Sequence, residues 1–229
     1  MEINSIATIY TDLPAKFGIP RQSGLVEGLT GRIVMEKEYR RAEAFKELDG
    51  YSHIWLIWGF SENGGKWQPT VRPPRLGGNR RVGVFASRSP FRPNGLGISA
   101  VKLLAIDWDC EDAPVLYVGG IDMMDGTPIY DIKPYAQHAD CIPQATGGFS
   151  AAVAEYDLKV KAAGDILSKL PEDKRAALLG ILAQDPAPHY QDDPERIYGF
   201  EFAGFEVKFR RAEGEIELLS IESAGPAKQ

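Results

Sequence analysis

The sequence predicts a mainly β protein, with an antiparallel barrel or sandwich as its N-terminal domain and a small α+β domain at its C-terminus. Three observations indicate this. The 229 residues include 24 glycines and 16 prolines, above average usage, which favours many short elements joined by tight turns. Short runs alternate apolar and polar residues along much of the chain. Helical spacing is confined to two segments, so we expect domains of residues 1–142 and 143–229.

The N-terminal domain is expected to consist of short strands joined by loops. The predicted strands are Ile3–Tyr10, Gly31–Glu36, His53–Phe60, Ile98–Asp107, Pro114–Ile121 and Ile129–Ile132. The third run is apolar on both alternating faces, which predicts a central strand covered on both sides. Between the second and third runs, residues 39–48 place apolar side chains among charges and predict one short amphipathic helix that Gly50 ends.

The C-terminal domain is expected to begin after a linker at Pro143–Ser150. Ala152–Leu158 alternates like a strand. Pro171–Gln184 predicts a helix, because proline occupies its first position and acidic residues follow in the first turn. Three further alternating runs, separated by turns at Gly204 and Gly214, predict the strands Tyr198–Phe202, Phe205–Arg210 and Glu215–Ile221.

Charge is distributed unevenly along the chain. The net charge of -6 argues against a protein that coats nucleic acid non-specifically, because phosphate binding depends on accumulated Lys and Arg. Between Asn63 and Ile106, however, there are eight Lys and Arg and no Asp or Glu. Up to Gly97 this segment is also broken by proline and glycine, and a long loop of this kind in a compact domain is typically functional.

Several classes of protein are disfavoured. A secretory signal and a membrane-length apolar run are missing from the sequence, so we expect a cytoplasmic protein with no membrane partner. Neither the Gly-rich fingerprint of a Rossmann cofactor site nor a Walker loop occurs. We expect no metal site, because metal-ligand spacing is not found among Cys110, Cys141, His53, His138 and His189.

Three loops in the N-terminal domain allow both a structural and a functional interpretation. Ile19–Leu25 is either a turn or a backbone loop that approaches a ligand at Gly24. Thr70–Asn79 sets two arginines around Pro-Pro, as a solvated loop or as a clamp for a carboxylate or phosphate. Val84–Gly97 interleaves phenylalanine with arginine, a composition that suits stacking on bases and contact with phosphates.

Two further polar segments leave the same choice open. Asp122 and Asp125 are either turn carboxylates or acceptors for ligand hydroxyl and amino groups. Leu182–Tyr190 follows the predicted helix, where Asp-Pro either ends the helix or holds polar side chains rigidly in a site.

Together these segments resemble the TrmO family of tRNA methyltransferases, also known as the TsaA-like or YaeB-like family. The resemblance covers nearly the whole chain, and long motifs in the same order make it specific. It rests on residues 20–25, 51–55, 69–79, 83–94, 125–128, 131–135 and 182–186.

The resemblance implies a homodimer of β-barrel subunits that binds S-adenosylmethionine. It implies methyl transfer to the exocyclic nitrogen of threonylcarbamoyl-adenosine, next to a tRNA anticodon. Carried onto matching positions, the cofactor site draws on Gln22, Ser23, Gly24, Ser61, Glu62, Arg88, Leu96, Asp125, Gly126, Thr127 and Pro128. In the family, the motif after the C-terminal helix usually reads Asp-Pro-Arg-Pro. Here Ala187 stands in place of the arginine, so one contact with tRNA or cofactor is missing.

Methyl transfer from a sulfonium is an in-line displacement, which requires alignment and removal of the nitrogen's proton. We expect Asp185 or Tyr190 to serve as the base, and Arg75 or Arg92 to bind the threonyl carboxylate. The expected tRNA-facing surface consists of Arg72, Arg75, Arg80, Arg81 and Arg92. Two other interpretations stay open: a sensor that binds S-adenosylmethionine without methyl transfer, and an RNA-binding module without a cofactor.

Overall fold

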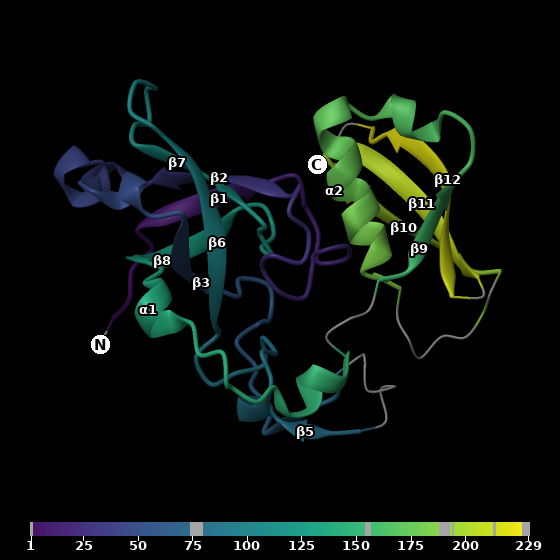
Figure 1. The fold of residues 1–229 in the computed structure, drawn as a ribbon, viewed down its shortest axis with the longest axis horizontal. Helices are drawn as coiled ribbons and strands as arrows, with labels where there is room; N and C mark the ends of the chain where they lie inside the picture. Colours follow the sequence, from purple (N-terminus) through teal and green to yellow (C-terminus); the bar gives the residue numbers. More distant parts are fainter. Residues whose placement is uncertain are drawn as a thin grey trace.

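The fold is seen in a computed structural model that describes residues 2–73, 80–153, 157–187, 193, 195–212 and 214–225. Two modules lie side by side in Figure 1, a barrel on the left and a helix-covered sheet on the right. A β-rich first part followed by an α+β second part confirms the predicted fold class.

Antiparallel strands of the first module close into a barrel, in the order β1-β2-β7-β6-β3-β8 with β8 pairing back onto β1. The strands are β1 (Ala7–Thr11), β2 (Thr30–Met35), β3 (His53–Gly59), β6 (Leu96–Asp107), β7 (Val115–Gly119) and β8 (Thr127–Pro134). Closure gives each of them a neighbour on both sides, which removes the open edges that a sandwich would keep.

β3 is fully buried on one face only, whereas the sequence predicts a strand covered on both faces. Ile54, Leu56 and Trp58 point into the core and are buried, whereas Trp55 and Ile57 on the outer face are only half-buried. Buried and half-buried residues alternate along β3 because a barrel strand has one face inside and one face outside. The outer face is covered in part by the short helix α1 (Gln137–Asp140), since the Trp55 indole donates a hydrogen bond to the carboxylate of its last residue at 2.9 Å.

The long loops of the barrel meet at one of its ends, which we call the loop end. β1, β3 and β7 finish there, and β2, β6 and β8 begin there, because the register pairs Thr30 with Gly119, Leu96 with Gly59 and Thr127 with Ile9. The connecting loops are residues 12–29, 60–95 and 120–126. Loops distant in sequence are thereby gathered around one opening of the barrel.

The loop of residues 60–95 has little regular structure, as predicted. Where it is described, β4 (Thr70–Val71) pairs with β5 (Val82–Gly83), and the 3-10 helix η5 (Val84–Ala86) follows. In Figure 1 this loop occupies the lower part of the view.

The C-terminal module is a sheet in the order β10-β11-β12-β9, covered by helix α2. Its elements are β9 (Lys159–Ala162), the 3-10 helix η7 (Ile166–Lys169), α2 (Glu172–Ala183), β10 (Ile197–Phe202), β11 (Phe205–Ala212) and β12 (Glu215–Ser223). Leu178, Ile181 and Leu182 of α2 are buried, on the face that the sequence predicts. The three predicted C-terminal strands are confirmed.

The loop of residues 12–29 packs against the C-terminal module. Lys174 of α2 pairs with Asp12 at 2.5 Å, and Phe17 stacks on Tyr198 of β10 with ring centroids 6.5 Å apart. The apolar side chains of both modules belong to one contiguous core. This loop therefore connects two strands of the barrel, and its side chains pack against both modules.

Three expected elements are corrected. Residues 39–48 do not form one amphipathic helix, because the segment contains the 3-10 helices η1 (Lys37–Tyr39), η2 (Ala42–Phe45) and η3 (Leu48–Gly50), with Glu47 in the left-handed region at φ 67°. The first strand begins at Ala7 rather than Ile3. The expected strand at 152–158 is wrong where described, since η6 spans Gly148–Val153 and β9 begins at Lys159.

Candidate functional site

The expected cofactor residues converge at the loop end of the barrel. Gln22, Ser23 and Gly24 lie in the loop after β1, Ser61, Glu62 and Arg88 lie in the loop after β3, and Leu96 begins β6. Asp125 and Gly126 close the loop after β7, and Thr127 and Pro128 begin β8. Segments more than 100 residues apart in sequence thus surround one opening, although this alone does not assign a ligand.

Gly24 lies where two loops make close backbone contact. Its N–H donates to the carbonyl of Gly120 at 2.8 Å, and a Cβ on Gly120 would come within 3.2 Å of Gly24. Both glycines have positive φ, 81° and 69°, a conformation that costs glycine little. On its other side Gly24 faces open space, since a Cβ placed there would meet nothing within 4 Å. The loop therefore presents bare backbone, as a closely bound ligand requires.

A hydrogen-bonded chain runs from the barrel interior to this loop. The indole of Trp58 donates to the hydroxyl of Ser99 at 3.0 Å, and this hydroxyl donates to the Asp122 carboxylate at 2.6 Å. Ser99 is fully buried. An indole nitrogen only donates, which fixes the direction of the first bond, and an ionised carboxylate only accepts, which fixes the second.

The ionised form of the Asp122 carboxyl is also favoured by its own backbone amide, by the backbone amide of Ser23 and by the charge of Arg88. Burial nevertheless raises the pKa of Asp122 above its ordinary value, against the lowering effect of these hydrogen bonds and of Arg88. A carboxyl group with a perturbed pKa beside converging loops is a candidate for ligand binding.

Arg88 and Gln22 are joined directly, since the guanidinium donates to the Gln22 side-chain carbonyl. Arg88 is exposed and Gln22 is half-buried. The pair connects the loop after β3 to the loop after β1 and leaves a cationic group facing solvent at the loop end.

The segment from Asp125 to Pro128 has a clear structural role. The Asp125 carboxylate accepts the backbone N–H of Thr11 at 2.8 Å, and the buried Thr127 hydroxyl donates to the Met124 carbonyl at 2.7 Å. Gly126 has φ 74° at the turn. For these side chains the structure favours the turn interpretation, and any ligand contact they make is additional to it.

Ser61, Glu62 and Leu96 flank the opening from the β3 side. The Glu62 carbonyl accepts a hydrogen bond from the Lys16 ammonium at 2.5 Å, which links the loops after β3 and β1. Ser61 and Glu62 are exposed, and Leu96 is half-buried at the start of β6. All three lie at the edge of the opening.

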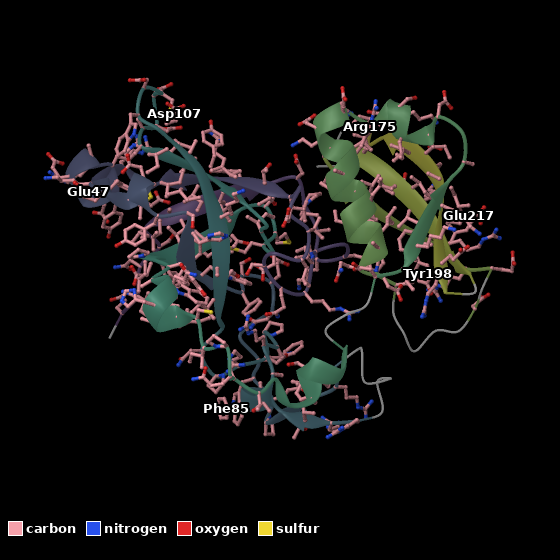
Figure 2. The ribbon with its side chains drawn as sticks, in the orientation of Figure 1. Glu47, Phe85, Asp107, Arg175, Tyr198 and Glu217 are labelled. Atoms are coloured by element: carbon pink, nitrogen blue, oxygen red, sulfur yellow. The ribbon has the colours of Figure 1, made fainter. Side chains whose placement is uncertain are left out.

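Arg92 is used within its own loop. One of its guanidinium nitrogens donates to the carbonyls of Val84 and Ser87, at 3.1 and 2.7 Å, and the guanidinium carbon lies 5.8 Å from the centre of the Phe85 ring. These contacts fix the η5 turn. Phe85 itself is 76% exposed and lies at the lower edge of Figure 2, far from Glu47 and Asp107 on the other side of the barrel.

Other arginines of the basic segment face solvent. Arg72, Arg80 and Arg81 are exposed, and the Arg81 guanidinium is steadied by a hydrogen bond to the Thr70 hydroxyl at 2.9 Å. Arg75, the other arginine of the expected clamp, lies outside the described residues. The described part of the segment offers a cationic surface next to an exposed aromatic ring.

The tail residue Asp185 is buried at the end of α2. It has φ 50°, its backbone N–H donates to the Leu182 carbonyl at 3.0 Å, and its carboxylate pairs with Arg211 of β11 at 3.2 Å. Asp185 therefore ends the helix, and its ion pair with Arg211 connects the helix to β11. Tyr190, the other expected catalytic residue, lies outside the described residues.

Asp185 also borders a small cavity of about 110 Å³ between the modules. One wall is the loop of residues 16–21, which leads directly into Gln22, and the other is the end of α2 with Pro186. Ala187 next to it is buried, so the position that carries arginine in the family motif is filled by packing here. Residues 184–186 and the loop that leads into Gln22 thus line the same cavity.

Sequence reasoning did not single out Ser99 and Trp58 as site residues. The available signal was that Ser99 occupies an inward position of an alternating strand, where a hydroxyl needs a partner. Within the described parts of the chain, no group of His, Cys, Asp and Glu is arranged to hold a metal ion. No helix there is long and apolar enough to cross a membrane.

Comparison with known proteins gives matches along nearly the whole chain. Residues 8–141 match the family model described as tRNA-methyltransferase O N-terminal domain, and residues 155–224 match the TrmO C-terminal domain. A tRNA (adenine(37)-N6)-methyltransferase of Escherichia coli strain K12 is 36% identical over 230 residues, covering 96% of this chain and 97% of the relative. One from Eikenella corrodens is 48% identical over 166 residues, covering 72% and 93%. A crystal structure of TrmO from Pseudomonas aeruginosa aligns with a TM-score of 0.79 at 30% identity, covering 97% of both chains.

Proposed function

The chain belongs to the TrmO family of tRNA methyltransferases, and on that premise we propose that it methylates N6 of adenine 37 in tRNA with S-adenosylmethionine as methyl donor. The observation that carries the proposal is the convergence of the motif segments 20–25, 83–94 and 125–128 at the loop end of a barrel with the same fold. Relatives similar over most of the chain carry the name of this activity.

The residues at the loop end fit such a cofactor. Open backbone at Gly24 allows close approach, and groups of both charge signs suit a ligand with a carboxylate, an ammonium and a sulfonium. Gln22, Ser23, Gly24 and Arg88 would hold it, with Ser61, Glu62, Leu96 and residues 125–128 completing the wall. When bound, the sulfonium supplies an activated methyl group, and the protein's task is to align the acceptor nitrogen with it.

For the acceptor we propose the threonylcarbamoyl form of the adenine. Its carbamoyl group makes the exocyclic nitrogen a better acid than a bare amine, so one base suffices. The threonyl carboxylate needs a cation, and the basic segment supplies several. The contacts of Arg92 with its own loop assign that residue to shaping the surface, which leaves Arg72, Arg75, Arg80 and Arg81 for direct contact with RNA.

We keep Asp185 and Tyr190 as candidates for the acceptor side of the reaction. Support for Asp185 comes from its position in the cavity wall opposite residues 16–21, which lead into Gln22.

We also propose a homodimer with a domain boundary after residue 142, in which the segment after α2 acts at the partner's site. Sedimentation equilibrium measures the oligomeric state, and a monomer active at assay concentration would remove the partner from the mechanism.

The proposal is tested by methyl transfer from labelled S-adenosylmethionine to tRNA, followed by mass spectrometry of the anticodon-loop nucleosides. Methylated threonylcarbamoyl-adenosine is the expected product. Transfer to an adenine lacking the threonylcarbamoyl group at an equal rate contradicts the finer substrate assignment. Cofactor binding without transfer to any tRNA identifies a sensor, and RNA binding without a cofactor identifies a binding module.

A further inference from the structure

We propose that Asp122 and Arg88 bind the amino-acid end of the cofactor as a zwitterion, with Arg88 taking its carboxylate and Asp122 its ammonium group. This inference rests on the proposed function and adds Asp122, which the matched motif positions do not include, to the cofactor site.

The carboxylate of Asp122 is held in place before any ligand arrives. The hydrogen-bonded chain from Trp58 through the fully buried Ser99 ends on it, and the backbone amides of Asp122 itself and of Ser23 also favour its ionised form. The Ser99 hydroxyl accepts from Trp58 and donates to Asp122, and backbone amides can only donate, so the carboxylate is held as an acceptor.

The surroundings of Asp122 compensate the charge of its ionised carboxylate only in part. Burial raises the pKa of its carboxyl, so the hydrogen bonds and the charge of Arg88 do not fully offset the cost of ionisation. Arg88 is exposed and its guanidinium is directed to Gln22. A bound ammonium group would place an opposite charge beside the carboxylate. Because the carboxylate is already oriented, less free energy is lost on binding, which raises the affinity.

The combination of charges selects one part of the cofactor. An anionic and a cationic side chain next to the open backbone of Gly24 match an α-amino acid, which carries both charges on one carbon. The adenosine part carries neither charge. By contrast, Asp125 is engaged by the backbone N–H of Thr11 and serves the turn.

Calorimetry on the full-length protein distinguishes the possible roles of Asp122 with three ligands. S-adenosylmethionine and S-adenosylhomocysteine share the amino-acid end, and only the first carries the sulfonium charge. 5′-Methylthioadenosine lacks the amino-acid end. The variants are Asp122→Asn, which keeps the shape and removes the charge, Ser99→Ala, which removes the orienting donor, and Asp109→Asn, a control for an exposed carboxylate elsewhere on the barrel.

We expect Asp122→Asn to weaken both amino-acid-bearing ligands equally, by roughly 10- to 100-fold, the range for a lost hydrogen bond between charged groups, and to leave methylthioadenosine unchanged. Ser99→Ala should weaken the same two ligands by roughly several-fold, and Asp109→Asn should weaken none.

Other patterns overturn the assignment. A larger loss for S-adenosylmethionine than for S-adenosylhomocysteine places Asp122 at the sulfonium. An equal loss for all three ligands means that the variant only disturbs the loop, which its melting temperature would report. Loss of turnover with unchanged affinities makes Asp122 a catalytic residue instead. If wild-type protein binds none of the ligands, the proposed function itself fails, whereas wild-type binding with an unaffected Asp122→Asn variant refutes only the zwitterion site.

Discussion

The two ends of the barrel are built from the same strands but differ in loops and charge. At the loop end, residues 60–95 carry seven Lys and Arg against one acid, Glu62. At the other end, the connection of residues 108–114 has three acids and no Lys or Arg, and residues 36–52 fold into short 3-10 helices. Figure 2 shows Glu47 and Asp107 on that far side and Phe85 away from them.

Under the proposed function, we expect the polyanionic substrate and the cofactor to bind at the loop end. Both ends are closed by the same hydrogen-bonded strands, so stability alone does not require polar groups to gather at one of them. The buried donor chain and the open glycine backbone occur at the loop end, where the basic segment also starts. Function is therefore expected to respond to changes at the loop end and to tolerate matched changes at the far end.

The largest effect is expected for Asp185→Asn. If this carboxylate acts on the acceptor, turnover per folded molecule should fall by about two to four orders of magnitude, the usual span for a general base, with cofactor affinity nearly unchanged. The melting temperature should fall as well, because the pair with Arg211 is lost. Arg211→Gln breaks the same pair but keeps the carboxylate. Wild-type turnover in Asp185→Asn, with both variants merely less stable, would end the catalytic interpretation.

A smaller effect is expected for Phe85→Ala. If this exposed ring stacks on a base, affinity for a labelled anticodon stem-loop should fall by roughly 5- to 100-fold in fluorescence anisotropy, with the salt dependence unchanged. Phe85→Trp should retain binding because the stacking face is kept. Tyr51→Ala, which removes an exposed ring beyond the far end of β3, is the matched control. Equal losses in the two alanine variants contradict a specific stacking role.

A change in salt dependence is expected for Arg80→Ala. Each lysine or arginine that neutralises a phosphate contributes to the slope of log affinity against log salt, so this variant should reduce the slope by about 1. Arg41→Ala removes an exposed arginine at the far end and should leave the slope unchanged. An unaltered slope after substitution of Arg72, Arg80 and Arg81 together would reject the basic segment as the RNA surface.

Much of the fold was predictable because its signals are local. The C-terminal strands follow from alternation and from turns at Gly204 and Gly214, which have φ 78° and 80°. Closure of the barrel was not predictable from the residues, since β1 pairs with β8 across more than 100 residues. The helix expected at 39–48 was wrong because apolar spacing does not distinguish one α-helix from successive 3-10 turns.

The site was predictable only in part. The motif segments 20–25, 83–94 and 125–128 meet at one end of the barrel, and the sequence correctly located the basic segment in an irregular loop, whereas 51–55 and 131–135 lie at the other end and 182–186 in the C-terminal module. The sequence does not show which way a charged side chain points, so the bonds from Arg92 to Val84 and Ser87 were not foreseen. Nor was the contact between Ser99 and Asp122, which depends on how β6 and the loop after β7 approach each other.

The smallest expected effect concerns the stability of the ligand-free protein, again at Asp122. Its folded-state pKa is raised above the value in the unfolded chain, so its contribution to stability is fully present below the unfolded pKa and is lost as pH rises through the folded pKa. As pH rises through that pKa, ionising the poorly hydrated carboxyl costs free energy that the weak field of the exposed Arg88 does not fully offset. Asp122→Asn should raise the melting temperature at pH 7 by about 2–4 °C, the shift that roughly 1 kcal/mol produces in a chain of this size. The gain should shrink as pH falls through the raised folded-state pKa of Asp122, because the wild-type carboxyl becomes neutral there as well. Differential scanning calorimetry from pH 4 to 7.5, with Asp109→Asn as the far-end control, measures this trend. A destabilised Asp122→Asn protein at pH 7 would show that the carboxylate serves the fold, and the contrast between the two ends of the barrel would then rest on the basic segment alone.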